Sequence, residues 1–125
     1  MNKEDFKERT KDFTQGCVNL ALTLPNTILE RQLQGQLTRS CSSVAANYRA
    51  ASIAHSKVSF TSKLSSVIEE VDESLFWLAF IIKENLLNSE ILNALIKEAG
   101  ALTAIFISSR KIIQENMKAE INDEL

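Results

Sequence analysis

Hydrophobic side chains recur every three or four positions along most of the chain. Between residues 27 and 54 the apolar positions step by 4, 4, 4, 3, 4 and 3, which is the period of one face of an α-helix. Similar stripes run through residues 3–24, 57–86 and 89–117, and we expect each boundary to hold to about four residues. In chain order, the four stripes consist of Phe6, Phe13, Cys17, Leu20 and Leu24; Leu29, Leu33, Leu37, Cys41, Val44, Tyr48 and Ala51; Phe60, Leu64, Val67, Val71, Leu75, Leu78 and Ile82; and Leu92, Leu95, Ala99, Leu102, Phe106, Ser109 and Ile113.

Short breaks separate the four segments. Pro25 ends the first one, because the residue before a proline avoids the helical region. Ser56 or Ser59 is suited to cap the start of the third segment, and Asn88 or Ser89 the start of the fourth. The sequence therefore predicts four helices joined by short connections.

The number of chain-breaking residues agrees with this prediction. The 125 residues include one Pro and three Gly, and no alternating strand pattern competes with the helical one. Gly35 lies inside the second segment, where it either permits close approach of another helix or is simply tolerated. We predict an all-α fold, an antiparallel up-down-up-down four-helix bundle, in one domain over residues 1–125, with a polar C-terminus that frays from about residue 118.

The composition is that of an ordinary soluble globular protein, with 45% apolar and 24% charged residues. The net charge of −2 does not indicate a general binder of polyanions. The first residues are charged, unlike a secretory signal, and the longest unbroken apolar run, residues 75–82, is shorter than the roughly 20 residues that span a bilayer. We expect a cytoplasmic protein without a membrane segment.

The two cysteines, Cys17 and Cys41, both fall on apolar stripes. In a hairpin centred on Pro25 they are offset by about seven residues, or roughly 10 Å along the axis. A disulfide needs Cα atoms within about 7 Å of one another, so we expect two free thiols.

Residues suited to catalysis or metal binding are sparse. His55 is the only histidine, and no Cys-x-x-Cys or Glu-x-x-His occurs. The acids Glu69, Glu70, Asp72 and Glu73 have the composition of a carboxylate metal site, but bundle metal sites draw their ligands from several helices. We expect no catalytic residues, no metal and no cofactor, and hence not an enzyme.

One stretch has more apolar surface than a bundle needs. Every residue from 75 to 82 is apolar, whereas a bundle helix requires one stripe. Surplus apolar surface on a small chain is typical of self-association, and the alternative is a wide stripe that serves an irregular core. The predicted oligomer interface consists of Phe76, Trp77, Phe80 and Ile81.

Charges are sorted along the sequence. Residues 31–68 contain five basic residues and no acid, whereas residues 69–98 contain seven acids and two lysines. We expect these segments to neutralise each other, within a bundle or between subunits. The alternative is a basic face for RNA or DNA, with contacts from Arg31, Arg39, Arg49, Lys57 and Lys63.

Five sequence pieces, in order, carry a family resemblance. They are RTKDF at 9–13, QLTRSCSSVAANYRAA at 36–51, SKVSFTSKL at 56–64, EEVDESLFWL at 69–78 and KEAGALTAIF at 97–106. Over residues 9–113 the chain resembles the bacterial four-helix bundle family first noticed as products of intervening sequences in large-subunit ribosomal RNA genes. The resemblance implies a ring-shaped homopentamer. It also implies kinship with the accessory protein of diversity-generating retroelements, a basic barrel that partners a reverse transcriptase.

The resemblance brings no catalytic residues, but it does bring a polar set. Glu70, Glu73 and Trp77 match family positions on the third helix. On the second helix the matching set, which we call the helix-two polar seam, consists of Arg39, Ser40, Ser43, Asn47 and Tyr48.

We interpret the helix-two polar seam as structural. Ser40, Ser43 and Asn47 repeat at three and four residues and share a helix face, and a buried polar seam fixes register. Arg39 is suited to bridge to an acid on another helix. The alternative is a ligand groove lined by Arg39, Ser43 and Asn47.

The sequence thus favours a non-enzymatic, homopentameric scaffold or adaptor that binds itself and a protein or ribonucleoprotein partner. The alternative is a ring that binds RNA or DNA directly through residues 31–68. Family members often carry acids where this chain has Ala50 and Ser59, and their loss slightly favours the nucleic-acid alternative.

Overall fold

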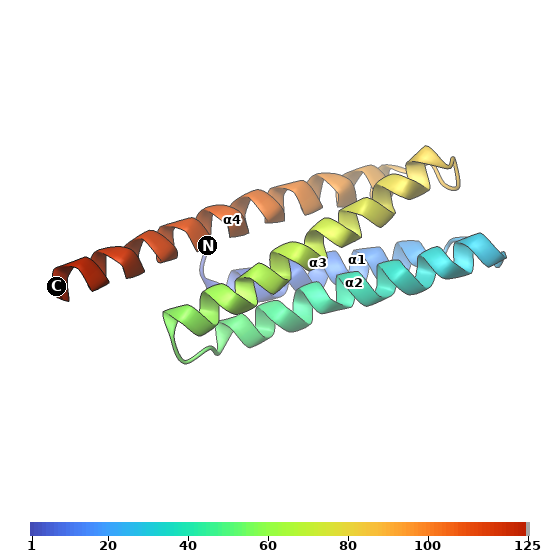
Figure 1. Ribbon diagram of the computed structural model, residues 1–125. Coiled ribbons are helices and arrows are strands. Elements are labelled where there is room, and N and C mark those ends of the chain that lie inside the picture. The colour runs from blue at the N-terminus through green and yellow to red at the C-terminus, as the bar shows by residue number, and fades with distance from the viewer. Residues whose placement is uncertain (125) are drawn as a thin grey trace.

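The computed structural model describes residues 1–124 and confirms the predicted all-α bundle. The four helices are α1 (Lys3–Ala21), α2 (Ile28–Ser52), α3 (Lys57–Lys83) and α4 (Glu90–Glu124), and no strand occurs in the described residues. Consecutive helices run antiparallel, and α1 packs mainly on α2, α2 on α3, and α3 on α4 (Figure 1). The contact between α1 and α4 is the weakest, so few side chains close the bundle.

A Ser, Thr or Asn side chain caps the N-terminus of each of the four helices. Asn2 forms a capping box with Asp5, and Thr27 accepts from the third backbone N–H of α2. Ser56 rather than Ser59 caps α3, and Ser89 rather than Asn88 accepts from a backbone N–H in the first turn of α4. Each cap satisfies a backbone donor that has no partner within its own helix.

The end of α3 lies three residues before the predicted boundary at 86. Asn85 adopts a left-handed conformation with φ 54°, which stops the helix. The N–H of Leu86 donates to the carbonyl of Ile81 at 3.1 Å, and that of Asn85 donates to Ile82 at 3.0 Å. This pair of bonds is a Schellman motif, a signal that hydrophobic periodicity does not report.

Helix α4 is longer than the sequence predicts. It continues to Glu124 rather than ending at 117. Fraying of the chain from about residue 118 stays a prediction. Lys57 at the start of α3 pairs with Glu120, and the segment is rich in residues of high helix propensity. The end of α4 projects beyond the rest of the bundle (Figure 1).

The predicted stripes form the core, with a correction on α3. Leu75 is half-buried and Ile82 is 42% exposed, whereas Ser74 and Ile81 are fully buried. In a stretch that is apolar all round, periodicity cannot tell which face turns inward. On α2 the first stripe position, Leu29, is likewise exposed.

The register of the first hairpin also differs from the prediction. The Thr14 hydroxyl donates to the carbonyl of Cys41, and Gln34 donates to the carbonyl of Ala21 at 2.8 Å. These contacts centre the hairpin between residues 27 and 28 rather than on Pro25, so the predicted offset of the two cysteines is wrong. Cys17 lies opposite residue 38, about 4.5 Å along the axis from Cys41.

The two cysteines are free and fully buried, as predicted, although they are neighbours. The pKa of the Cys17 thiol lies well above its ordinary value because of its hydrogen bond with Cys41 and because of burial. The sulfur of Cys41 also donates to the carbonyls of Thr38 and Thr14. The pair therefore acts as packing within the α1–α2 interface.

Helix α4 is, by length and composition alone, apolar enough to cross a bilayer. Core helices of soluble proteins pass the same test. The buried side of α4 packs on the bundle through Leu92, Leu95, Ala99, Leu102 and Phe106. The expectation of a chain without a membrane segment stays a prediction.

Candidate functional site

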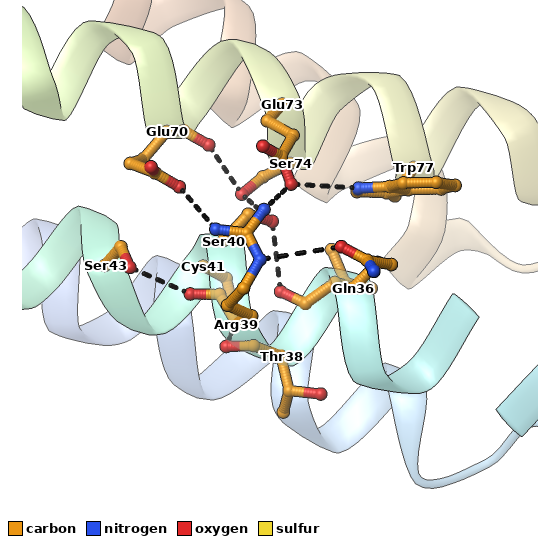
Figure 2. A network of polar contacts seen from close by, with 11 residues as sticks. Gln36, Thr38, Arg39, Ser40, Cys41, Ser43, Glu70, Glu73, Ser74 and Trp77 are labelled. Carbon is orange, nitrogen blue, oxygen red and sulfur yellow. Dashed lines mark hydrogen bonds and ion pairs between the residues drawn. The ribbon is translucent and has the colours of Figure 1, made fainter. Parts of the chain in front are cut away.

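Arg39 is the centre of a polar network on the outer surface between α2 and α3 (Figure 2). One terminal nitrogen lies 3.4 Å from the Glu70 carboxylate, and the other pairs with the carboxylate of Glu73. The Nε atom of Arg39 donates to the side-chain oxygen of Gln36 at 3.5 Å. The prediction that Arg39 bridges to an acid on another helix is confirmed, and it bridges to two.

Beneath this ion pair, a serine pair joins the same two helices. The hydroxyls of Ser40 and Ser74 lie 2.9 Å apart, and both residues are fully buried. Ser74 also reaches the backbone carbonyl of Glu70 at 2.8 Å, and Ser40 that of Leu37 at 3.2 Å. Small side chains with satisfied hydroxyls let α2 and α3 pack closely here without an orphaned polar group.

The rest of the helix-two polar seam does not form one continuous line. Ser43 donates to the Arg39 carbonyl in its own helix at 3.0 Å, and Asn47 is half-buried without a side-chain hydrogen bond inside residues 1–124. Tyr48 lies in the core with Phe6 and Phe106, at centroid distances of 6.1 and 5.3 Å. The seam was therefore predicted too broadly: among its members, within residues 1–124, Arg39 and Ser40 alone form polar contacts with α3.

An aromatic cluster on α3 adjoins the network. The indole N–H of Trp77 donates to Glu73 at 3.2 Å (Figure 2), and its ring centroid lies 4.9 Å from that of Phe76 and 6.2 Å from that of Phe80. Phe76 is 57% exposed, whereas Trp77 and Phe80 are half-buried. Ile81 is fully buried in the core, so its assignment to an oligomer interface is wrong. We call Phe76, Trp77 and Phe80 the outer aromatic cluster.

The five predicted nucleic-acid contacts differ in their surroundings. Arg39 is paired with α3, and Lys57 is paired with Glu120 of α4. Arg31, Arg49 and Lys63 are exposed. The neutralisation expected between the basic and acidic segments is thus observed within one chain for Arg39.

A basic groove that the sequence reasoning missed lies between α1 and α2. It has a volume of about 240 Å³ and is lined by Lys7, Lys11, Ala45, Ala46 and Arg49. The two lysines are four residues apart on α1, so they share a face with the alanine-rich part of α2. Lys7 and Lys11 lie among acids in the sequence, outside the acid-free residues 31–68, so charge sorting along the chain does not reveal them.

A further interhelical ion pair joins α1 to α4. Arg9 holds Glu98 through two nitrogens, Nε and Nη2, each 2.7 Å from a carboxylate oxygen. Donation of these hydrogen bonds to the Glu98 carboxylate raises the pKa of Arg9 above its ordinary value. Both residues belong to the family-like pieces RTKDF and KEAGALTAIF, although neither was singled out from the sequence.

Two of the four acids of α3 form ion pairs. Glu70 and Glu73 turn toward Arg39, and within residues 1–124 no three His, Cys, Asp or Glu side chains are grouped so that they could hold a metal ion. The absence of catalytic activity, metal and cofactor stays a prediction.

These contacts define the class of protein: an antiparallel four-helix bundle whose recurring polar residues tie neighbouring helices together. The chain belongs to the 23S rRNA-intervening sequence protein family, whose family model matches residues 2–108. This match confirms the resemblance seen in the sequence pieces.

One solved structure supports the same assignment. The chain is similar to a protein with unknown function from the S23 ribosomal protein family of Bacteroides thetaiotaomicron VPI-5482, at 28% sequence identity and a TM-score of 0.77. The similarity covers 84% of this chain and 97% of that chain. No curated protein matches.

Proposed function

We propose that this protein is a non-enzymatic scaffold that assembles into a closed homo-oligomer and binds a protein or ribonucleoprotein partner in the cytoplasm. The observation that carries the proposal is the outer aromatic cluster. The number of subunits, five, follows from the family resemblance.

The outer aromatic cluster has the composition of an interface centre. Aromatic residues and Arg are enriched in protein interfaces, and here Trp77 contacts Phe76 and donates to Glu73, the acid that pairs with Arg39. Full burial of one large apolar side chain is worth about 1.5–3 kcal/mol, and Phe76 leaves much of that unrealised in a monomer. Assembly through this surface would recover it in every subunit.

The projecting end of α4 offers a second apolar surface. Ile107 and Ile121 are exposed in the C-terminal half of this helix and, at fourteen residues apart, lie on one side of it. A closed ring needs two complementary surfaces on each subunit, because its interfaces are heterologous. The outer aromatic cluster on α3 and these isoleucines on α4 are suited to be such a pair.

The test uses the single tryptophan of the chain, which lies in the cluster. We expect light scattering to give an assembled mass at tens of micromolar, and the emission of Trp77 to shift to longer wavelength as dilution dissociates the ring. Phe76→Glu and Phe80→Glu should give smaller species with helicity largely kept.

The matched control is Val58→Glu, a change to an equally exposed apolar residue on the first turn of the same helix. It should leave the mass unchanged. A monomeric unmodified protein would refute the scaffold proposal, whereas an unchanged mass for Phe76→Glu and Phe80→Glu would place the interface on another face.

A second candidate function, direct binding of RNA or DNA, is favoured by the basic groove between α1 and α2. Lys7, Lys11 and Arg49 surround a floor of alanines that lets a phosphate backbone approach. We expect a mobility shift with structured RNA that weakens steeply with salt and is lost in Lys11→Glu/Arg49→Glu. Lys63→Glu, on α3, is the control, and equal loss in both would argue against this groove.

A further inference from the structure

A pocket of about 390 Å³ opens at the end of the bundle where α1 and α3 begin. Its walls are mainly apolar, and the residues relevant to binding are Lys3, Phe6, Tyr48, Phe60, Phe106 and Ser109. Its size falls within the range of about 300–1,000 Å³ that is typical of small-molecule sites. Neither the outer aromatic cluster nor the basic groove includes any of these residues.

Tyr48 provides a polar group inside this pocket. The side chain is 2% exposed, and its hydroxyl makes no hydrogen bond to any of the described residues. Every fully buried side-chain N or O atom in that part of the chain has a partner. The Tyr48 hydroxyl therefore faces the open space of the pocket, where it is free to donate to a ligand.

Burial also keeps this hydroxyl a donor. It raises the pKa of Tyr48 to about 12, so the phenol stays protonated at physiological pH. The ring centroids of Phe6 and Phe106 lie 5.5 Å apart, and both rings contact the ring of Tyr48. Together they form an aromatic wall around a single hydroxyl, an arrangement that orients an apolar ligand with one acceptor atom.

A cation stands at the rim. The Lys3 ammonium lies 4.9 Å from the centroid of the Phe60 ring, and both residues also line an adjoining pocket of about 320 Å³. Three further polar side chains lie at this second pocket. His55 and Ser56 carry no negative charge, and Lys57 is already paired with Glu120. The rim thus favours an anionic head group over a cationic one.

We propose that this pocket binds a small amphipathic carboxylate, whose apolar body contacts the aromatic wall and whose head group lies between Lys3 and the Tyr48 hydroxyl. The site needs no contact from the outer aromatic cluster, so it is separate from the proposed assembly surface. A ligand of this class would stabilise the contact between α1 and α4, the weakest in the bundle, because Phe6 and Phe106 come from those two helices.

The test is calorimetric titration of the full-length protein with octanoate, with octylamine and octanol as probes of equal chain length. Octanoate should bind about tenfold more tightly than octylamine, because one charge-assisted hydrogen bond changes an affinity by about that factor. Lys3→Glu should abolish this preference, and it keeps α1 intact because an acid is favourable in a first helical turn. Tyr48→Phe should weaken octanoate about fivefold while preserving the ring packing.

The matched control is Lys97→Glu, which makes the same charge change at an exposed position of α4 outside the pocket. It should bind octanoate as the unmodified protein does. The proposal is overturned if octanoate fails to bind, if octylamine binds equally well, or if Lys97→Glu and Lys3→Glu weaken binding to the same extent. It is also overturned if the pocket binds only in a dissociated variant such as Phe80→Glu, because a second chain then fills it.

Discussion

The helical glycines give the sharpest test of the packing, because two of them should respond to alanine in opposite ways. A Cβ built on Gly35 of α2 meets nothing within 4 Å, whereas one on Gly16 of α1 lies 2.8 Å from a terminal carbon of Leu95. Gly35 is therefore tolerated rather than required for close approach, whereas Gly16 lets α1 approach α4.

The magnitudes follow from helix propensity and contact distance. Gly-to-Ala in a helix interior gains about 1 kcal/mol. Gly35→Ala should gain nearly all of this free energy of unfolding and raise the melting temperature by about 4 °C. For Gly16→Ala the same gain is opposed by overpacking, which costs about 1–3 kcal/mol, since Leu95 must move away from its place against α1. We expect a net loss of up to about 2 kcal/mol.

The assay is urea unfolding followed by circular dichroism, at one fixed protein concentration because assembly would couple stability to concentration. Gly100→Ala on α4 is the matched control, since its Cβ also meets nothing within 4 Å. It should behave like Gly35→Ala. If Gly16→Ala stabilises the protein as much as the other two changes, the close approach of α1 to α4 is refuted.

Three further predictions concern the polar and buried groups. Ser40→Ala and Ser74→Ala should each cost about 1 kcal/mol in urea unfolding, and the double variant should cost less than the sum, because the bond between the two hydroxyls can be lost only once; additive losses would contradict this pairing. Glu98→Gln should lower the free energy of unfolding by about 1 kcal/mol at low salt, less at high salt, and an equal loss at both would show that Arg9 acts through packing. Burial raises the pKa of Tyr48 to about 12, so the melting temperature should be constant below pH 10 and fall as the pH rises toward 12. In Tyr48→Phe the fall in melting temperature over this pH range should be smaller, because the phenol that ionises is absent.

Much of the fold could be predicted from the sequence because helical periodicity is a local property. Three- and four-residue steps placed Leu33, Leu37 and Val44 in the core of α2, where all are buried. The caps at Ser56 and Ser89 could likewise be predicted, because a hydroxyl before a helix has a local partner. An ion pair from Arg39 to an acid on another helix was also anticipated, although its partners Glu70 and Glu73 were not.

Where the sequence was apolar all round, only tertiary packing could choose the inward face. Ser74 and Ile81 lie in the core, and the predicted Leu75 and Ile82 do not, because the α2–α3 interface accepts a small serine that hydrogen-bonds to Ser40. Polar residues are normally expected outside, so no single-chain pattern could reveal a serine with a buried partner thirty-four residues away.

The sequence by itself determined the number of helices, their approximate ends and their inward stripes, because these depend on neighbours a few residues apart. Tertiary structure alone decided the hairpin register that brings Cys17 beside Cys41, the groove that joins Lys11 to Arg49, and the pocket around Tyr48. Each of these joins residues from different helices. Their relative position depends on how whole helices slide and rotate against one another, and that is settled by the packing of many side chains at once.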